Sequence, residues 1–213
     1  MVTKLAVTDV VKSLNQAESR FNLIREIDLQ FFPEWFENLP ELTAQETAML
    51  DRVRRIHAYH RADGPLTEGT VNLLILSPLL YLAGFCEPPF KIRAEVSVEI
   101  THQQRDEILR GRIDALVLQN LFWLVFVESK PSTFACLDAI PQALAYMMAN
   151  PVSQQPAFGL VTNGDDFIFV KLVKQSSRYA LSTNLSLLEV PDNGLYRVLR
   201  VMKRIGEQIG VAE

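Results

Sequence analysis

The spacing of apolar residues changes along the chain, and the change predicts where helices end and strands begin. Residues 8–37 carry an apolar stripe at helical spacing and predict one long helix. A second helix begins at a capping box that starts with Thr43, and it stops before the Asp-Gly-Pro turn at 63–65. A third, almost wholly apolar helix is expected over residues 68–83, closed by Gly84.

After residue 90 the apolar period shortens to two, which is typical of strands. The pattern predicts strands over 91–101, 108–118, 121–130, 157–162, 167–173 and 179–181, and helices over 137–149 and 194–209. The strand over 121–130 is apolar on both faces until its end, as expected for a central strand. Asn163-Gly164 is a strong hairpin signal between two of these strands, and the strand over 179–181 is expected at an edge.

The order of these elements predicts an α/β fold, more closely an α+β mixed sheet flanked by helices. A helical crossover after the strand over 121–130 returns the next strand parallel to it, while the three strands before the crossover form an antiparallel meander. Residues 1–65 are expected to form a helical N-terminal extension, residues 66–190 the core, and residues 191–213 a C-terminal helix packed on that core.

Composition adds few constraints to this picture. A chain of 213 residues with 48% hydrophobic and 22% charged residues suits one globular domain with an appendage. No apolar run reaches the roughly 18 residues of a membrane span, and no signal-peptide core follows Met1, so a cytoplasmic protein is expected. Cys86 and Cys136 are expected as two buried free thiols in a reducing compartment. The net charge of −4 and the pI of about 5.5 do not indicate nucleic-acid binding.

A group of charged residues lies at the end of the apolar strand. Glu128 and Lys130 are two residues apart and therefore project from the same face, while Asp114 lies on the preceding strand of the same hairpin. Carboxylates without nearby histidine or thiolate favour Mg²⁺ or Mn²⁺. The bland alternative is an ordinary ion pair at a strand end, and the short motif alone leaves both possibilities open.

Asp114, thirteen intervening residues and then Glu128-Ser129-Lys130 together resemble the motif of the PD-(D/E)xK restriction-endonuclease-like nucleases. Ile113 stands where that superfamily usually has proline. Glu68 resembles an additional acidic residue found on the preceding helix, and Gln142 with Tyr146 resembles a Gln-x-x-x-Tyr motif on the following one. Residues 66–173 are similar to the N-terminal nuclease region of type I restriction enzyme R subunits, through Thr67-Glu68, residues 111–114 and residues 160–164.

This resemblance implies a restriction-endonuclease-like core and a role for each matching residue. Asp114, Glu128, the Ser129 carbonyl and Glu68 would ligate Mg²⁺ (or Mn²⁺), and Lys130 would position and help deprotonate a water. Glu68 could also relay a proton, Gln142 and Tyr146 would orient the site and contact the DNA backbone, and Arg112 would contact a phosphate. The sequence has no Gly-x-x-x-x-Gly-Lys-[Ser/Thr] loop, so the ATP-driven motor of a full R subunit is not expected in it.

The function implied is Mg²⁺-dependent hydrolysis of DNA, with DNA as partner. A homodimer and contacts with other restriction-system subunits stay open, as do two alternatives: an inactive nuclease-fold module that binds nucleic acid or protein, and an RNA-directed nuclease. His57 and His60 could hold a metal, although a solvated helix face explains them as well. The run Arg52-Arg54-Arg55 is interpreted as a charged helix face. Phosphate contacts could also come from Lys91, Arg93, Arg105, Arg110 and Arg112, although their alternation is equally that of an ordinary solvated sheet face.

Overall fold

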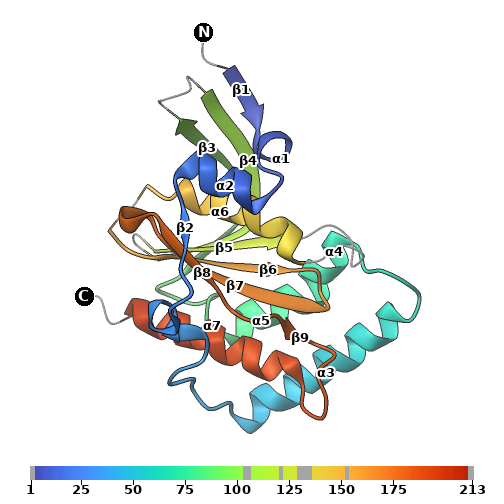
Figure 1. Cartoon of the computed structure of the whole chain (residues 1–213). Helices are drawn as coiled ribbons and strands as arrows, with labels where there is room; N and C mark the ends of the chain where they lie inside the picture. Colours follow the sequence, from blue (N-terminus) through green and yellow to red (C-terminus); the bar gives the residue numbers. More distant parts are fainter. Residues whose placement is uncertain (1–2, 103–106, 120–121, 129–135, 152–153, 211–213) are drawn as a thin grey trace.

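The structure is a computed structural model, described for residues 3–102, 107–119, 122–128, 136–151 and 154–210. Within these residues, nine strands form one mixed sheet with helices on both faces (Figure 1). The strands are β1 (Thr3–Ala6), β2 (Ile24–Arg25), β3 (Lys91–His102), β4 (Glu107–Gln119), β5 (Phe122–Glu128), β6 (Ala157–Thr162), β7 (Asp166–Val173), β8 (Arg178–Leu181) and β9 (Leu185–Ser186). Their order is β1-β4-β5-β6-β7-β8-β2, with β3 beside β4 and β9 beside β7.

The helices surround this sheet in two layers. They are α1 (Val7–Val10), α2 (Leu14–Phe21), α3 (Ala44–Arg61), α4 (Glu68–Val71), α5 (Ser77–Leu82), α6 (Ile140–Met148) and α7 (Gly194–Gly210). A π-helical segment, η3 (Asn72–Leu76), joins α4 to α5, and short 3₁₀ turns occur at η1 (Leu29–Phe31), η2 (Pro33–Trp35), η5 (Cys136–Ala139) and η6 (Lys174–Ser176). No helix in the described part of the chain is long and apolar enough to cross a membrane.

The centre of the sheet confirms the predicted mixed α+β class. Strands β3, β4 and β5 form an antiparallel meander, α6 crosses over, and β6 returns parallel to β5 with Leu124 opposite Phe158. Strand β7 then pairs antiparallel with β6 through the predicted hairpin. In that hairpin Asn163 Oδ1 accepts from the N–H groups of Asp165 and Asp166, and Gly164 has a φ of +89°. This arrangement is consistent with a restriction-endonuclease-like core.

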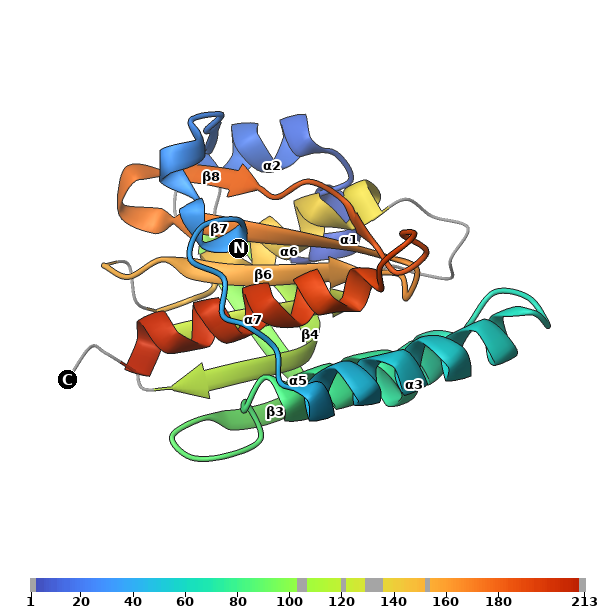
Figure 2. The same ribbon diagram turned by 90° about the horizontal axis from the view of Figure 1, so that it is seen from below.

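Two apolar cores lie on opposite faces of the sheet. Helices α1, α2 and α6 cover one face, and α3, α5 and α7 cover the other (Figure 1). Figure 2, seen from below, shows α7 lying across the sheet and α3 farther out beside α5. The predicted inward stripe of α7 is fully buried and comprises Leu195, Val198, Leu199, Met202 and Ile205. The C-terminal helix therefore packs on the sheet as its apolar spacing predicted.

The prediction of one long helix over residues 8–37 is wrong. Asn22 adopts the left-handed conformation with a φ of +53° and ends α2. The chain then becomes extended, because the Ile24 N–H donates to the Ser177 carbonyl and β2 pairs with β8. Together with β1, which pairs with β4, the segment before residue 65 thus adds two strands to the sheet. For the same reason β8 is not an edge strand.

The expectation of two buried free thiols is confirmed for Cys136 and is wrong for Cys86. Both cysteines are free, but Cys86 is exposed in the turn after α5.

Candidate functional site

The backbone places the two central acidic positions on neighbouring strands. The pairing of β4 with β5 ends where Ala115 lies opposite Phe126, so Asp114 and Glu128 lie one and two residues beyond the last paired position. Glu128 is the last residue of β5. The predicted Ser129 and Lys130 lie outside the described residues. The backbone therefore brings Asp114 and Glu128 to the same end of the β4–β5 pairing, although they are not direct partners in it.

The helix that begins with Glu68 packs against the same end. Glu128 pairs with Thr162 of β6, and the Thr162 hydroxyl accepts from the Gly164 N–H at 3.0 Å. A methyl group on Gly164 would lie 2.8 Å from Val71 Cγ2, so the hairpin and α4 are in close contact. Glu68 is exposed in the first turn of α4. Three elements that carry predicted acidic residues thus meet at one end of the sheet, where α4 lies in Figure 1.

Gln142 and Tyr146 form a hydrogen-bonded pair on α6. Gln142 Nε2 donates to the Tyr146 hydroxyl at 2.6 Å, and the Tyr146 side chain is only 2% exposed. The tyrosine ring lies against Gly111, since a Cβ there would be 2.3 Å from Tyr146 Cε1. Gly111 precedes Asp114 by three residues on β4. The pair therefore supports the strand that carries Asp114, and the implied contact of Gln142 and Tyr146 with the DNA backbone stays a prediction.

Replacing Gly111 with alanine is expected to lower the free energy of unfolding by about 1–3 kcal/mol, because the new methyl group overlaps a buried ring. Urea denaturation measures this loss. Gly69→Ala is a matched control, since among the described residues no atom outside the neighbouring backbone lies within 4 Å of a Cβ at that position. If Gly111→Ala unfolds at the same urea concentration as wild type, close packing of the Tyr146 ring against Gly111 does not contribute to stability.

Arg112 also lies on β4 and keeps an accessible guanidinium. Its side chain is 63% exposed, and Nη1 is 3.9 Å from Glu95 Oε1, an exposed pair that contributes little to stability. Glu95 has a φ of +53°, which is unusual for a non-glycine residue in a strand. The β3–β4 pairing continues on both sides of it, so Glu95 lies across from Asp114. Arg112 is thus open to an anionic ligand near the candidate site.

A buried ionic cluster on α3 was not predicted from the sequence. His57 is fully buried, and its Nε2 lies 2.8 Å from Asp165 Oδ1, while Arg61 Nε donates to Asp165 Oδ2 at 3.1 Å. The signal for burial was present, because His57 continues the apolar stripe of Leu50 and Val53. His60 is exposed, and no group of three potential ligands exists among the described residues, so the alternative metal site on α3 is not supported.

The Asp165 carboxylate should make the free energy of unfolding depend on pH. Burial by itself raises the pKa of Asp165, but hydrogen bonds from His57 and Arg61 outweigh it and lower the pKa below the ordinary 3.8. A carboxyl whose pKa is lowered on folding contributes stability above its unfolded pKa, and this is lost as the pH falls through the folded-state pKa. Wild type should therefore be more stable than Asp165→Asn near neutral pH, and the difference should shrink below pH 3.8.

Urea denaturation of both proteins across this pH range checks the expectation. Asp192→Asn, an exposed aspartate before α7, should instead follow wild type at every pH. A constant difference between wild type and Asp165→Asn down to the lowest pH would show that the carboxylate charge is not what stabilises the cluster.

No protein-family model matches the chain, and no curated protein matches it. The chain is similar to a fragment of a putative HsdR subunit of a type I restriction enzyme from Vibrio vulnificus YJ016, with a TM-score of 0.40 and 16% sequence identity. The match covers 67% of this chain and 27% of that chain, so the present chain spans about a quarter of the protein it matches.

Proposed function

We propose that this protein is a Mg²⁺-dependent nuclease that hydrolyses phosphodiester bonds of DNA. The observation that supports the proposal is the convergence of β4, β5 and α4, which carry Asp114, Glu128 and Glu68, at one end of the sheet. The order and spacing of these residues resemble those of the PD-(D/E)xK nucleases. A protein of this kind would have DNA as its partner and could act beside other subunits of a restriction system.

The donor chemistry fits a hard divalent cation. Asp114, Glu128, Glu68 and the main-chain carbonyl of Ser129 are the oxygen donors that would hold Mg²⁺ or Mn²⁺. When bound, such a cation lowers the pKa of its water and offsets charge that develops on the scissile phosphate.

The other residues of the candidate site have separate tasks in this proposal. Lys130 orients the attacking water and assists its deprotonation. Arg112, with its exposed guanidinium, binds a phosphate oxygen of the substrate. The Gln142–Tyr146 pair holds β4 in place through the contact with Gly111, and so keeps Asp114 beside the end of β5. Cleavage therefore depends on two acidic strand positions and on the helix that supports one of them.

The direct test is cleavage of DNA by the purified protein. Linear duplex, supercoiled circular and single-stranded DNA are incubated with Mg²⁺, with Mn²⁺ or with EDTA. We expect strand breaks with either cation and none with EDTA. Absence of cleavage for all three DNA forms with both cations contradicts the proposal, and faster cleavage of an RNA of the same sequence favours the RNA-directed alternative.

One observation favours a second candidate, an inactive nuclease-fold module that binds nucleic acid or protein. The net charge of −4 is unusual for a DNA-binding enzyme. Isothermal titration with Mg²⁺ distinguishes the two, because a site with intact carboxylate ligands should bind the ion with a stoichiometry of at least one. Binding of DNA without any binding of Mg²⁺ favours the inactive module.

A further inference from the structure

The three arginines near the middle of α3 have different environments. Arg54 points toward the α7 side, where Nη1 donates to the Asp192 carbonyl at 3.1 Å and Nη2 donates to the Glu189 carbonyl at 3.3 Å. Arg52 and Arg55 are exposed, and neither has a hydrogen bond or ion pair within the described part of the chain. The run is therefore not one uniform charged face, because only two of its three cations remain available.

The acidic residues of α3 have hydrogen-bond or ion-pair partners beside α7, although Asp51 also lies close enough to Arg55 for that cation to help lower the pKa of Asp51. Asp51 accepts from the Tyr196 hydroxyl at 2.7 Å and from Asn193 Nδ2 at 3.2 Å, both beside α7. Glu46 pairs with Lys203 of α7 at 2.6 Å. The two carboxylates are thus half-buried and have partners beside α7, whereas Arg52 and Arg55 are exposed. The outward surface of α3 is basic although the chain as a whole is acidic.

Tyr59 extends this surface toward the end of the helix. It is 75% exposed, and residues 52, 55 and 59 are spaced by three and four, so they lie on one side of α3. We call Arg52, Arg55 and Tyr59 the α3 outer face. At about 1.5 Å per residue the face spans roughly 10 Å, over which one DNA strand presents about three phosphates. Arginine guanidinium and tyrosine hydroxyl groups are common phosphate contacts.

The α3 outer face leads away from the candidate active site. His57 and Arg61, near the C-terminal end of α3, bind Asp165 in the hairpin between β6 and β7. Gly164, which precedes Asp165 in that hairpin, lies against Val71 of α4, the helix that begins with Glu68. In Figures 1 and 2, α3 runs along the outside of the molecule from this end. A duplex held at the site can therefore continue over α3.

We propose that the α3 outer face binds the sugar–phosphate backbone of duplex DNA outside the position of cleavage. The inference rests on the proposed function, because the duplex reaches α3 from the candidate active site. Arg52 and Arg55 each bind phosphate oxygens, and the Tyr59 hydroxyl donates to a further one. These contacts do not recognise the base sequence, so they increase affinity for long duplexes of any sequence.

Fluorescence anisotropy with a labelled duplex in EDTA measures binding without cleavage. Each lost phosphate contact lowers the slope of log K against log salt concentration by about 1, so Arg52→Gln/Arg55→Gln should lower it by about 2 and weaken binding about tenfold or more. The matched control is Arg25→Gln/Arg197→Gln, which removes the same charge from exposed arginines on β2 and α7. The control should keep the wild-type slope, and Tyr59→Phe should weaken binding without changing the slope.

Cleavage assays separate this inference from the proposed function. In Mg²⁺, Arg52→Gln/Arg55→Gln should raise KM for a long duplex about tenfold with kcat unchanged, and should not affect a duplex too short to leave the site. If wild type cleaves DNA but the α3 variant binds with the same salt slope as wild type, the inference is overturned and the nuclease stands. If wild type binds with an α3-dependent slope and never cleaves, the nuclease fails and the DNA-binding face stands. No duplex binding at all overturns the inference.

Discussion

Asp114→Asn is expected to reduce Mg²⁺-dependent DNA cleavage at least a hundredfold, which corresponds to about 2.7 kcal/mol in the activation barrier. Asparagine has nearly the same size as aspartate, so β4 should keep its pairing with β3 and β5. The change removes one negative ligand, and divalent cations such as Mg²⁺ depend on carboxylate oxygens for affinity and position. Initial rates on a labelled duplex at saturating Mg²⁺ measure the effect.

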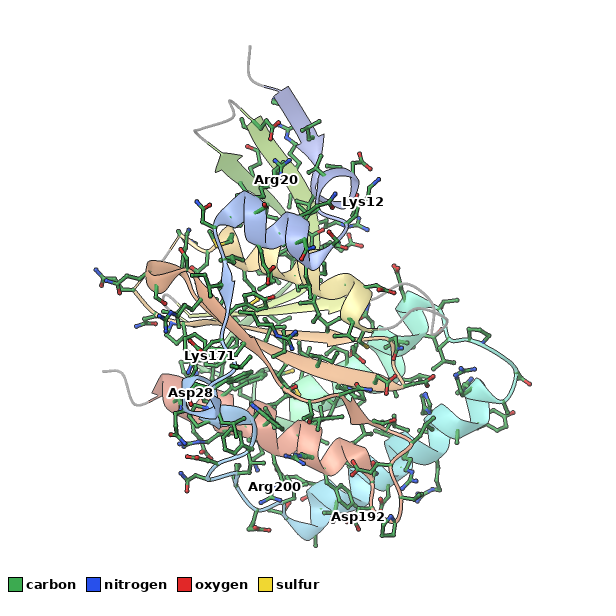
Figure 3. All side chains as sticks on the ribbon, viewed as in Figure 1. Lys12, Arg20, Asp28, Lys171, Asp192 and Arg200 are labelled. Atoms are coloured by element: carbon green, nitrogen blue, oxygen red, sulfur yellow. The ribbon has the colours of Figure 1, made fainter. Side chains whose placement is uncertain are left out.

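Asp192→Asn is the matched control for this experiment. Asp192 is exposed in the turn before α7 (Figure 3), outside the elements that carry the predicted ligands, and its replacement should leave the rate within about twofold of wild type. Glu128→Gln should act like Asp114→Asn, because both remove a predicted ligand. If Asp114→Asn keeps more than a tenth of the wild-type rate while its melting temperature is unchanged, Asp114 is not a metal ligand.

The strands that alternate between apolar and charged residues were predictable from the sequence alone. The predicted ranges 91–101 and 108–118 differ from β3 and β4 by one residue at each affected end. Helix α7 was predicted equally well, because its inward residues are fully buried and recur at helical spacing. Helix α7 buries one face, and in β3 the later apolar residues Val98 and Ile100 are buried, so these positions have the spacing on which the predictions rest. The apolar residues at the start of β3 are exposed and still alternate.

The N-terminal segment shows where such patterns are not sufficient. Residues 8–37 have helical spacing, yet a left-handed Asn22 ends α2, and the following two residues pair with β8. That pairing joins Ile24 to Arg178, and no local pattern reports a contact between residues so far apart in the chain. The tertiary contact with β8 therefore overrides the helical propensity of this segment, as often happens where a short strand completes a sheet.

In the candidate site too, some features were predictable from the sequence and others were not. The order of Glu68, Asp114, Glu128, Gln142 and Tyr146 was visible in the sequence, and so was the hairpin that joins β6 to β7. The contact of Tyr146 with Gly111 and the bond between His57 and Asp165 were not, because each joins residues that belong to different elements. Tertiary contacts therefore hold the candidate site together, and these are not readable from the sequence. The residues proposed to carry out the chemistry lie in short motifs, which are.

Lys171→Met is expected to lower the free energy of unfolding by about 3–5 kcal/mol, because it leaves a buried carboxylate without its cation. Lys171 Nζ donates to Glu34 Oε1 at 2.5 Å, and the two side chains are 12% and 4% exposed. The ammonium also lies within 6 Å of the ring centres of three phenylalanines, Phe31, Phe32 and Phe158. Figure 3 labels Lys171 beside the N-terminal segment that carries Glu34.

This pair joins η2 to β7, so its loss should loosen the N-terminal segment as well as the core. Urea denaturation of Lys171→Met, Glu34→Leu and the double variant forms a thermodynamic cycle. The double variant should recover most of the loss, since apolar replacement of both partners leaves no unpaired charge. Lys203→Met is the matched control and should cost about 1 kcal/mol, because its partner Glu46 keeps the hydrogen bonds from Thr43. A loss below about 1 kcal/mol for Lys171→Met would mean that Glu34 accepts from water or another donor once the lysine is gone. In that case the segment from β2 to η2 is held mainly by the buried Phe32.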